Sequence, residues 1–216
     1  QLGNASSANL SIVLDATRPG AELYQNVVPA TLITQTQTLT GTVQDAPAFL
    51  GAMVRLHLDD TNNALFVDNS GYEHHAVCQG SACPTAGQTG RFTVAPQFDG
   101  VNNVLSLRGS IVITNAKYSL TGWFKTSDTS AELITGKSGA TPYVMLSLEN
   151  GGQVRFQQRT ISGTLISVIS PAGYADNTWH HVAGVMVDGG LALYIDGLSV
   201  GTATGADRLQ VLLDGR

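Results

Sequence analysis

The amino-acid sequence predicts an all-β protein: an antiparallel jelly-roll β-sandwich over residues 51–216, preceded by an additional β segment over residues 1–50. Three features lead to this fold class. Glycine is frequent, at 24 of 216 residues, and serine and threonine recur throughout, as in proteins whose strands are joined by tight turns. Short segments alternate polar and apolar residues, with turn-forming residues about every 8 to 12 positions. No window carries the sustained 3.6-residue periodicity of a helix.

The N-terminal half contains isolated strand patterns. Residues 9–15 predict a strand that ends at the sequence Arg18-Pro19-Gly20, because proline and glycine interrupt extended structure. Residues 31–43 alternate over a long stretch and predict one or two exposed strands, which end before Pro47. Residues 54–58 alternate cleanly and predict a half-buried strand.

The C-terminal half is more regular, with strand patterns separated by glycine-containing turns. Asn150-Gly151-Gly152 and Asp196-Gly197 are tight-turn sequences between such patterns. Trp123 and Trp179 lie in or beside predicted strands, and we expect both side chains in the core. The predicted strands are 104–107, 111–113, 119–125, 132–136, 143–149, 153–159, 164–170, 180–188 and 191–195.

Composition excludes some classes of partner. The net charge is −5 and the chain has no basic run, so we expect no nucleic-acid partner. No stretch approaches about 18 uninterrupted apolar residues, so we expect no membrane insertion. Residues 1–14 lack a charged segment followed by an apolar one, so they predict no signal peptide.

The two cysteines, Cys78 and Cys83, are five positions apart, and Gly80 with Ser81 allows the turn that a disulfide between them requires. Free thiols, or a mixed metal site with His74 and His75, are the alternatives. A disulfide indicates an oxidising compartment, so we expect an extracellular or cell-surface location.

Six motifs occur in the order found in one known family. From Leu56 onward the chain resembles the laminin-G-like branch of the concanavalin A-like lectin/glucanase superfamily, especially domains of bacterial surface proteins. The resemblance implies a jelly-roll sandwich of the concanavalin A-like, laminin-G-like type. The motifs are residues 56–60, 68–75, 98–103, 119–125, 179–183 and 193–197.

The resemblance also suggests a strand supplied from elsewhere. In the family a further strand follows a segment like residues 211–216, and residues 10–19 with 39–45 resemble part of a bacterial immunoglobulin-like repeat. We expect an N-terminal strand to fill the missing place, within one molecule or in a neighbour, where it would build a filament. A fragment of a larger protein is the other interpretation. The complementing strand consists of Asn9, Leu10, Ile12, Val13 and Leu14.

The sequence predicts no enzyme. Glucanases with this fold carry two carboxylates in an E-x-D-x-x-E pattern on one strand, and that pattern is absent here. No G-x-S-x-G nucleophile elbow is predicted either, because the one match, residues 197–201, follows the Asp196-Gly197 turn with no helix predicted after it. His180 and His181 are adjacent in a predicted strand, so their side chains point to opposite faces.

Calcium is the one cofactor that the sequence suggests. The resemblance implies a calcium site at the rim, and Asp68, Asp99 and Asn102 provide hard oxygen ligands in predicted turns. The alternative is that these side chains shape the turns by hydrogen bonding to the backbone.

Together these features predict a non-catalytic extracellular module with a structural or adhesive role. Its expected partners are other copies of itself or neighbouring domains of the same protein, and it could form filaments by strand complementation. The alternative is a calcium-dependent, lectin-like module that binds glycans, in which Tyr72, Tyr143 or Tyr174 stacks on a sugar.

Overall fold

The computed structural model describes residues 52–113, 117–138, 140–160, 162–187, 189–205 and 211–214. Within these ranges the chain is built of β-strands with one short 3-10 turn, which confirms the predicted all-β class. The same part of the chain contains no helix with the length and hydropathy needed to cross a membrane. The predicted N-terminal segment 1–50, including its complementing strand, lies outside the described residues.

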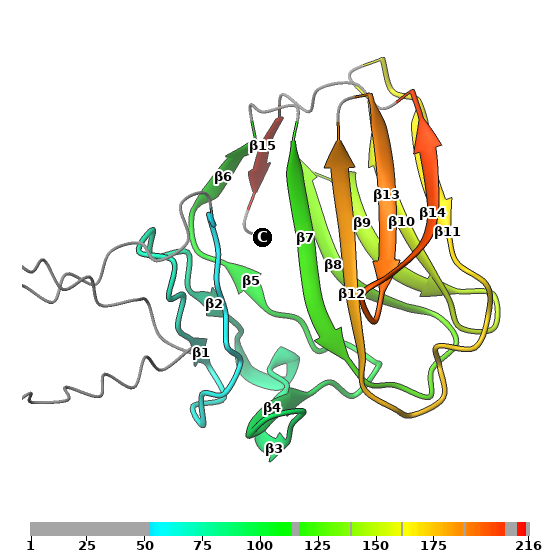
Figure 1. Cartoon of the computed structure of the whole chain (residues 1–216). Coiled ribbons are helices and arrows are strands. Elements are labelled where there is room, and N and C mark those ends of the chain that lie inside the picture. Colours follow the sequence, from blue (N-terminus) through cyan, green and yellow to red (C-terminus); the bar gives the residue numbers. More distant parts are fainter. Residues whose placement is uncertain are drawn as a thin grey trace, which may run out of the picture.

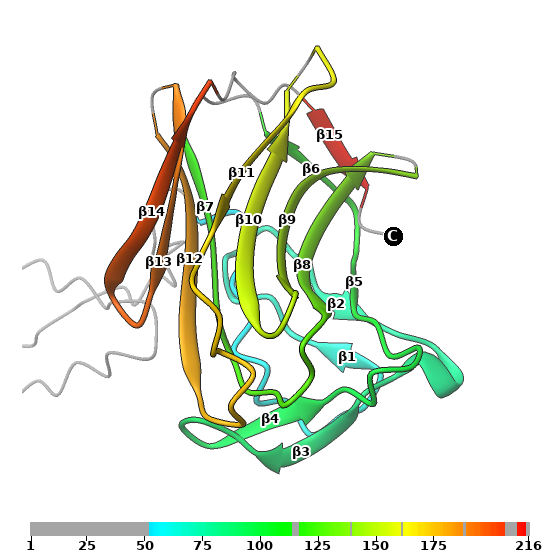
Figure 2. The same ribbon diagram turned by 90° about the vertical axis from the view of Figure 1, so that its right-hand side faces the viewer.

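The elements before the sandwich are short. They are β1 (Leu65–Phe66), β2 (Ala76–Val77), the 3-10 turn η1 (Gly80–Ala82), β3 (Thr85–Thr89), β4 (Val94–Gln97) and β5 (Ser106–Leu107). Strands β1, β2 and β5 form a small three-stranded sheet, while β3 and β4 form a separate hairpin. Figures 1 and 2 show this hairpin lying across one end of the sandwich.

The sandwich consists of longer strands. They are β6 (Ser110–Ile113), β7 (Tyr118–Phe124), β8 (Ala131–Ser138), β9 (Thr141–Glu149), β10 (Gln153–Arg159), β11 (Leu165–Ile169), β12 (His180–Val187), β13 (Gly190–Ile195), β14 (Leu198–Thr204) and β15 (Val211–Asp214). One sheet has the order β11-β10-β9-β8-β15-β6 and the other the order β14-β13-β12-β7. All strand pairs within these two sheets are antiparallel, and the two sheets face each other as layers (Figure 2).

The core lies between these layers because alternate residues of each strand point inward. Phe156 and Leu146 in one sheet and Leu193 and Met186 in the other are almost completely buried. The partly buried hydroxyl of Tyr118 on β7 donates a 2.7 Å hydrogen bond to Oε1 of Gln158 on β10, which links the sheets. Burial raises the pKa of Tyr118, so this hydroxyl keeps its proton and remains a donor.

One close approach between the layers requires a glycine. Gly184 on β12 faces the ring of Phe156, and a Cβ built at this glycine would lie 2.5 Å from Cδ2 of that ring. The missing side chain therefore makes the space that Phe156 fills.

One prediction about the strands is wrong, and the last described segment needs a separate description. Residues 54–58 do not form a strand: Leu56 makes only an isolated bridge to Asp68, and Leu58 has a φ of 57°, which ends the extended run. The segment 211–214, after which the family has a further strand, forms strand β15 between β8 and β6. It pairs with β6 along its length but with β8 only through Asp214 and Lys137.

We expect Gly184→Ala to lower the free energy of unfolding by about 1–3 kcal/mol, because the added methyl group overpacks the core against Phe156. Gly122→Ala is the matched control: its Cβ would come no closer than 3.9 Å, to Cδ1 of Ile134, and the change should be tolerated. Urea unfolding of both variants provides the measurement, and equal losses would contradict the packing argument.

Candidate functional site

The outward face of the four-stranded sheet carries exposed aromatic side chains. Along β7 the burial alternates, so Tyr118, Leu120 and Phe124 point inward while Thr121 and Trp123 point outward. The prediction that Trp123 lies in the core is therefore wrong: 41% of its surface is exposed. Trp179, also expected in the core, is half-buried just before β12.

Strand β12 extends this face with a histidine. His181 pairs directly with Trp123 across the sheet, and their ring centroids are 5.2 Å apart. Nε2 of His181 lies 2.8 Å from the hydroxyl oxygen of Thr121, at hydrogen-bonding distance. The Trp123 ring and the polar groups of Thr121 and His181 are thus held side by side on β7 and β12.

The β3–β4 hairpin adds a second aromatic ring and a cation. Its turn is closed by a hydrogen bond from the amide of Gly90 to the carbonyl of Thr93. Phe92, 76% exposed, contacts the Trp123 ring edge-to-face at 5.8 Å between centroids. The guanidinium carbon of Arg91 lies 5.0 Å from the Trp123 ring centroid and 5.3 Å from that of Phe92, within the range of cation–π attraction.

We call Arg91, Phe92, Thr121, Trp123 and His181 the aromatic cluster. Beside it, Ala183 pairs with Thr121 on one side and with Tyr194 on the other, so the three share the outward face. Ala183 places only a methyl group between Thr121 and Tyr194, and Tyr194 is 37% exposed. The face therefore offers flat rings at two points, with hydrogen-bonding groups between them.

Next to the cluster, His180 is held between two carboxylates. Its Nδ1 lies 2.8 Å from Oδ2 of Asp196, and its Nε2 lies 3.1 Å from Oδ1 of Asp176. The ring also packs against Phe124 and, edge-to-face, against Tyr174. The prediction that His180 and His181 face opposite sides is consistent with these separate partners.

The electrostatics of this trio favour an imidazolium ion. Burial acts to lower the pKa of His180, but the hydrogen bonds and charges of Asp196 and Asp176 outweigh it, so the pKa is raised. Burial acts to raise the pKa of Asp196, yet its bonds to His180 and to the His181 amide lower it overall. Because both ring nitrogens are engaged, His180 has no free nitrogen to act as a base and instead ties two turns to β12.

Asp68, one of the predicted calcium ligands, organises a turn. Its Oδ1 accepts hydrogen bonds from the amides of Arg55 and Ser70, at 2.7 and 2.9 Å. Its Oδ2 accepts them from the Ser70 hydroxyl and the His74 amide, at 2.7 and 2.9 Å. Burial acts to raise the pKa of this carboxyl, but the four donors lower it overall.

Asp99, the second predicted ligand, closes another turn. Its Oδ1 accepts hydrogen bonds from the amides of Val101, Asn102 and Asn103, and its own amide donates to Oδ1 of Asn103. These hydrogen bonds lower the pKa of Asp99, and the one from the Val101 amide has the largest effect. Asn102, the third predicted ligand, is therefore in the same turn, where its amide supports Asp99.

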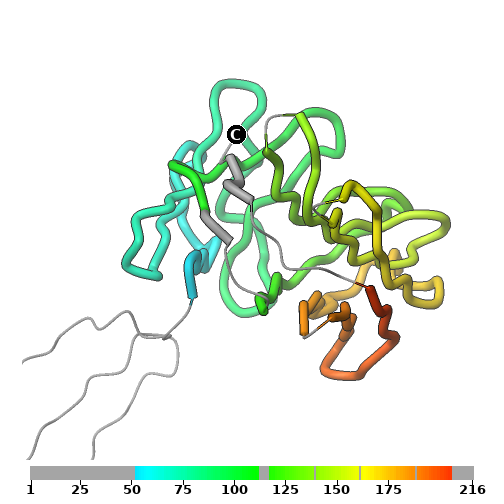
Figure 3. Tube along the Cα trace, turned by 90° about the horizontal axis from the view of Figure 1, so that it is seen from above, coloured from blue at the N-terminus to red at the C-terminus, as the bar shows by residue number. Residues whose placement is uncertain are grey.

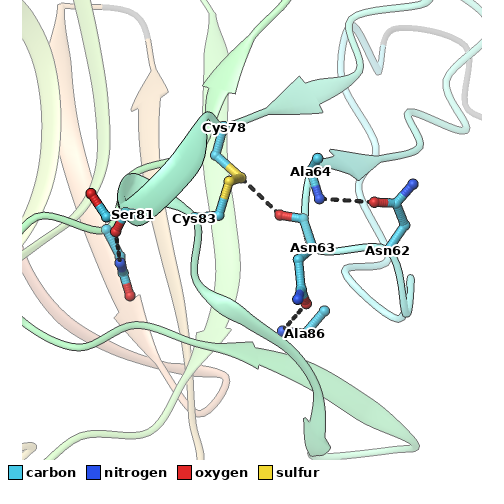
Figure 4. The surroundings of a disulfide bond; sticks show 8 residues. Asn62, Asn63, Ala64, Cys78, Ser81, Cys83 and Ala86 are labelled. Carbon is cyan, nitrogen blue, oxygen red and sulfur yellow. Dashed lines mark hydrogen bonds between the residues drawn. A yellow bond between two sulfur atoms is a disulfide. The ribbon is translucent and has the colours of Figure 1, made fainter.

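The predicted disulfide between Cys78 and Cys83 is present, with 5.0 Å between the Cα atoms (Figure 4). The Asp99 turn is fixed to this disulfide loop, since Nδ2 of Asn103 donates to the carbonyl of Ser81 and the amide of Val104 to that of Ala82. Sγ of Cys78 lies 2.8 Å from the carbonyl oxygen of Asn63; a bridged sulfur carries no proton, so this is a close contact and not a hydrogen bond.

Comparison with known families identifies the fold. A family model described as the concanavalin A-like lectin/glucanases superfamily matches residues 99–215, more than half of the chain. The chain belongs to this superfamily. No curated protein sequence matches it significantly.

Solved structures agree on the fold of this superfamily member. The binding domain of Paraclostridial Mosquitocidal Protein 1 superposes with a TM-score of 0.55 and 13% identity, over 69% of this chain and 40% of that one. The botulinum neurotoxin type G receptor binding domain superposes with a TM-score of 0.52 and 15% identity, over 76% of this chain and 44% of that one. The chain thus spans less than half the length of either domain.

The superfamily's implied calcium ion fits the predicted ligands unequally. Both oxygens of Asp68 already accept two hydrogen bonds each, so neither is left for a cation. At Asp99 all the hydrogen bonds found go to Oδ1, which leaves Oδ2 as the better ligand. No group of three or more His, Cys, Asp or Glu side chains is arranged for a metal within the described ranges. A calcium site remains a prediction that rests on the Asp99 turn.

Sequence reasoning missed the aromatic cluster. It placed Trp123 in the core and attached no role to Arg91 or Phe92. The outward position of Trp123 was available from the alternation of residues 118–124, in which the inward set is Tyr118, Leu120 and Phe124. The approach of the β3–β4 hairpin to Trp123 could not be predicted from the alternation, because it depends on contacts between residues about 30 positions apart.

We expect thermal stability to depend on pH through His180. Its pKa is raised on folding, so its contribution is complete below the unfolded value of about 6.5 and is lost as the pH rises through the folded value. The carboxylates have lowered pKa values, so their contribution is lost as the pH falls through those values. The melting temperature should therefore be highest in mildly acidic solution. His180→Gln should flatten the alkaline side of this profile, and an unchanged profile would contradict the assignment.

We expect Asp68→Ala to lower the free energy of unfolding by about 2–4 kcal/mol, because it leaves several partly buried donors without an acceptor. The loss should be the same with excess calcium and with a chelator. The exposed Asp59 provides the control, since Asp59→Ala should have little effect. A loss seen only in the presence of calcium would show instead that Asp68 is a metal ligand.

Proposed function

We propose that this protein is a non-catalytic, extracellular adhesive module that binds carbohydrate through the aromatic cluster. The observation that carries the proposal is the exposure of Phe92 and Trp123 beside the polar groups of Thr121 and His181. Exposed aromatic side chains gathered with hydrogen-bonding groups are typical of binding surfaces.

The chemistry of the cluster suits a sugar. A pyranose ring has an apolar face of C–H groups, which packs on an aromatic ring, and a rim of hydroxyl groups, which needs donors and acceptors. Trp123 and Tyr194 supply rings, while Thr121 and His181 supply hydrogen bonds. Arg91 adds a positive charge on a chain whose net charge is −5, which favours sugars that carry a carboxylate or sulfate group.

The similar toxin domains give this proposal support at the level of the fold. Both are named for binding, one as a binding domain and the other as a receptor binding domain. Their low identity to this chain means that ligand and site must be argued from the residues present here.

The residues of this chain also favour binding over hydrolysis, although the superfamily includes glucanases. Retaining glycosidases need two carboxyl groups about 5 Å apart across a cleft. Here Glu149 is paired with Arg155 at 2.6 Å, and Glu132 lies 3.8 Å from Lys137. Asp196 and Asp176 each bond to one nitrogen of the His180 imidazole, so this ring has no free nitrogen for catalysis.

The extracellular location is supported by the disulfide between Cys78 and Cys83, a bond that persists in oxidising compartments. Calcium dependence belongs to the same proposal in its lectin-like form, with Asp99 and Asn102 as the ligands that the Asp99 turn offers. A structural role through strand complementation, including assembly into filaments, is the second candidate function. It is favoured by the position of β7 at the end of its sheet.

A glycan array tests carbohydrate binding. We expect binding that is stronger to acidic than to neutral glycans and that falls about tenfold or more in Trp123→Ala and in Phe92→Ala, because each change removes a stacking surface. Tyr72→Ala is the control, since Tyr72 is 56% exposed but stacks on His74, outside the cluster. Repeating the array with a chelator separates calcium-dependent from calcium-independent recognition. Absence of binding by the folded wild-type chain would refute the proposal.

A further inference from the structure

The six-stranded sheet of the sandwich is wider than the four-stranded sheet, and it extends beyond that sheet on one side only. The four-stranded sheet ends at β14 and β7, while the six-stranded sheet ends at β11 and β6. Strands β14 and β11 pack against each other and close one side. On the opposite side β15 and β6 extend the larger sheet beyond β8, and in the described part of the chain no strand of the smaller sheet follows β7 (Figures 2 and 3).

The free edge of β7 lacks the features that usually protect an edge strand. Its seven residues pair with β12 without a register shift, from Tyr118 opposite Met186 to Phe124 opposite His180. The strand contains no proline and no charged residue. Among the described residues no further backbone hydrogen bond to β7 is found. Natural edges are shortened, charged, bulged or covered, so an edge of this kind is suited to accept a strand.

Apolar side chains line the space beside this edge. Tyr118 and Leu120 point inward from β7 and are only partly buried. Together with Ile111 of β6 they pack around the buried Val144. A strand added to β7 would lay its inward side chains over this group and extend the smaller sheet above β6.

We propose that residues 9–14 of this chain form that strand, from the same molecule or from a second copy. This deepens the second candidate function and is independent of glycan binding. Leu10, Ile12 and Leu14 would occupy one face and Ser11 and Val13 the other, with no charge before Asp15. Its six residues fit an edge of seven. Main-chain hydrogen bonds would provide affinity, and the three apolar side chains would fix which face points inward.

Paired cysteine substitutions test the contact in the full chain, where the native cysteines already form a disulfide. Ser11 or Val13 is changed to Cys together with Ser119→Cys, which lies on the outward face of β7. The matched control combines the same donor changes with Ser199→Cys on β14, at the other edge of the sheet. We expect a new disulfide with position 119 at least ten times more often than with position 199, seen on non-reducing gels.

The size of the cross-linked species identifies the donor molecule. A cross-link within one monomer supports the added strand and excludes filament assembly through it. Cross-linked dimers and longer ladders support both the added strand and filament assembly. Equal or no cross-linking at the two acceptor positions overturns the proposal. Either outcome leaves the glycan array unaffected, because Ser119 lies outside the aromatic cluster.

A pair of aspartate substitutions gives a second measurement that needs no cross-link. Ile12→Asp places a charge on the inward face of the donor and should lower the melting temperature by several degrees. Ser11→Asp places the same charge on the outward face and should have little effect. Equal melting temperatures for the two variants and the wild-type chain would also overturn the proposal.

Discussion

The packing of two β-layers through alternate side chains is the constraint on which the other features depend. At its centre the ring of Phe156 fills the space left by Gly184, and the Tyr118 hydroxyl bridges the layers to Gln158. Because the side-chain period of a strand is two, fixing the inward residues also fixes the outward ones. Burial of Leu120 and Phe124 therefore decides that Thr121 and Trp123 face solvent. The exposed face is a consequence of how the core is filled.

The charged and polar groups mostly hold the connections between strands. Asp68, Asp99 and Asp196 each accept backbone amide hydrogen bonds that a turn would otherwise leave without partners. His180 neutralises part of the charge of the Asp176 and Asp196 carboxylates. These side chains thus resemble the residues of a metal or catalytic site in type, while their hydrogen bonds are those of turn formation. Residue type alone does not distinguish the two roles.

The sequence was sufficient for the fold class, the family and the disulfide, because each depends on local patterns: alternation, turn residues and two closely spaced cysteines. It failed where distant residues decide. The Val54–Leu58 alternation does not form a strand, since Leu58 adopts a left-handed conformation that the pattern does not encode. Trp123 was assigned to the core by its type instead of its position in the alternation. Its contact with Phe92 depends on how a hairpin 30 positions earlier folds back across the end of the sheet.

The aromatic cluster is assembled from two parts that differ in their freedom to diverge. Trp123 and His181 sit on paired strands whose neighbours fill the core, so changes there risk the whole domain. Arg91 and Phe92 belong to a hairpin tip, which in evolution accepts substitutions and length changes with little penalty. Related domains could therefore acquire new specificities by exchanging this tip alone, in the way that antibodies vary loops on a constant framework.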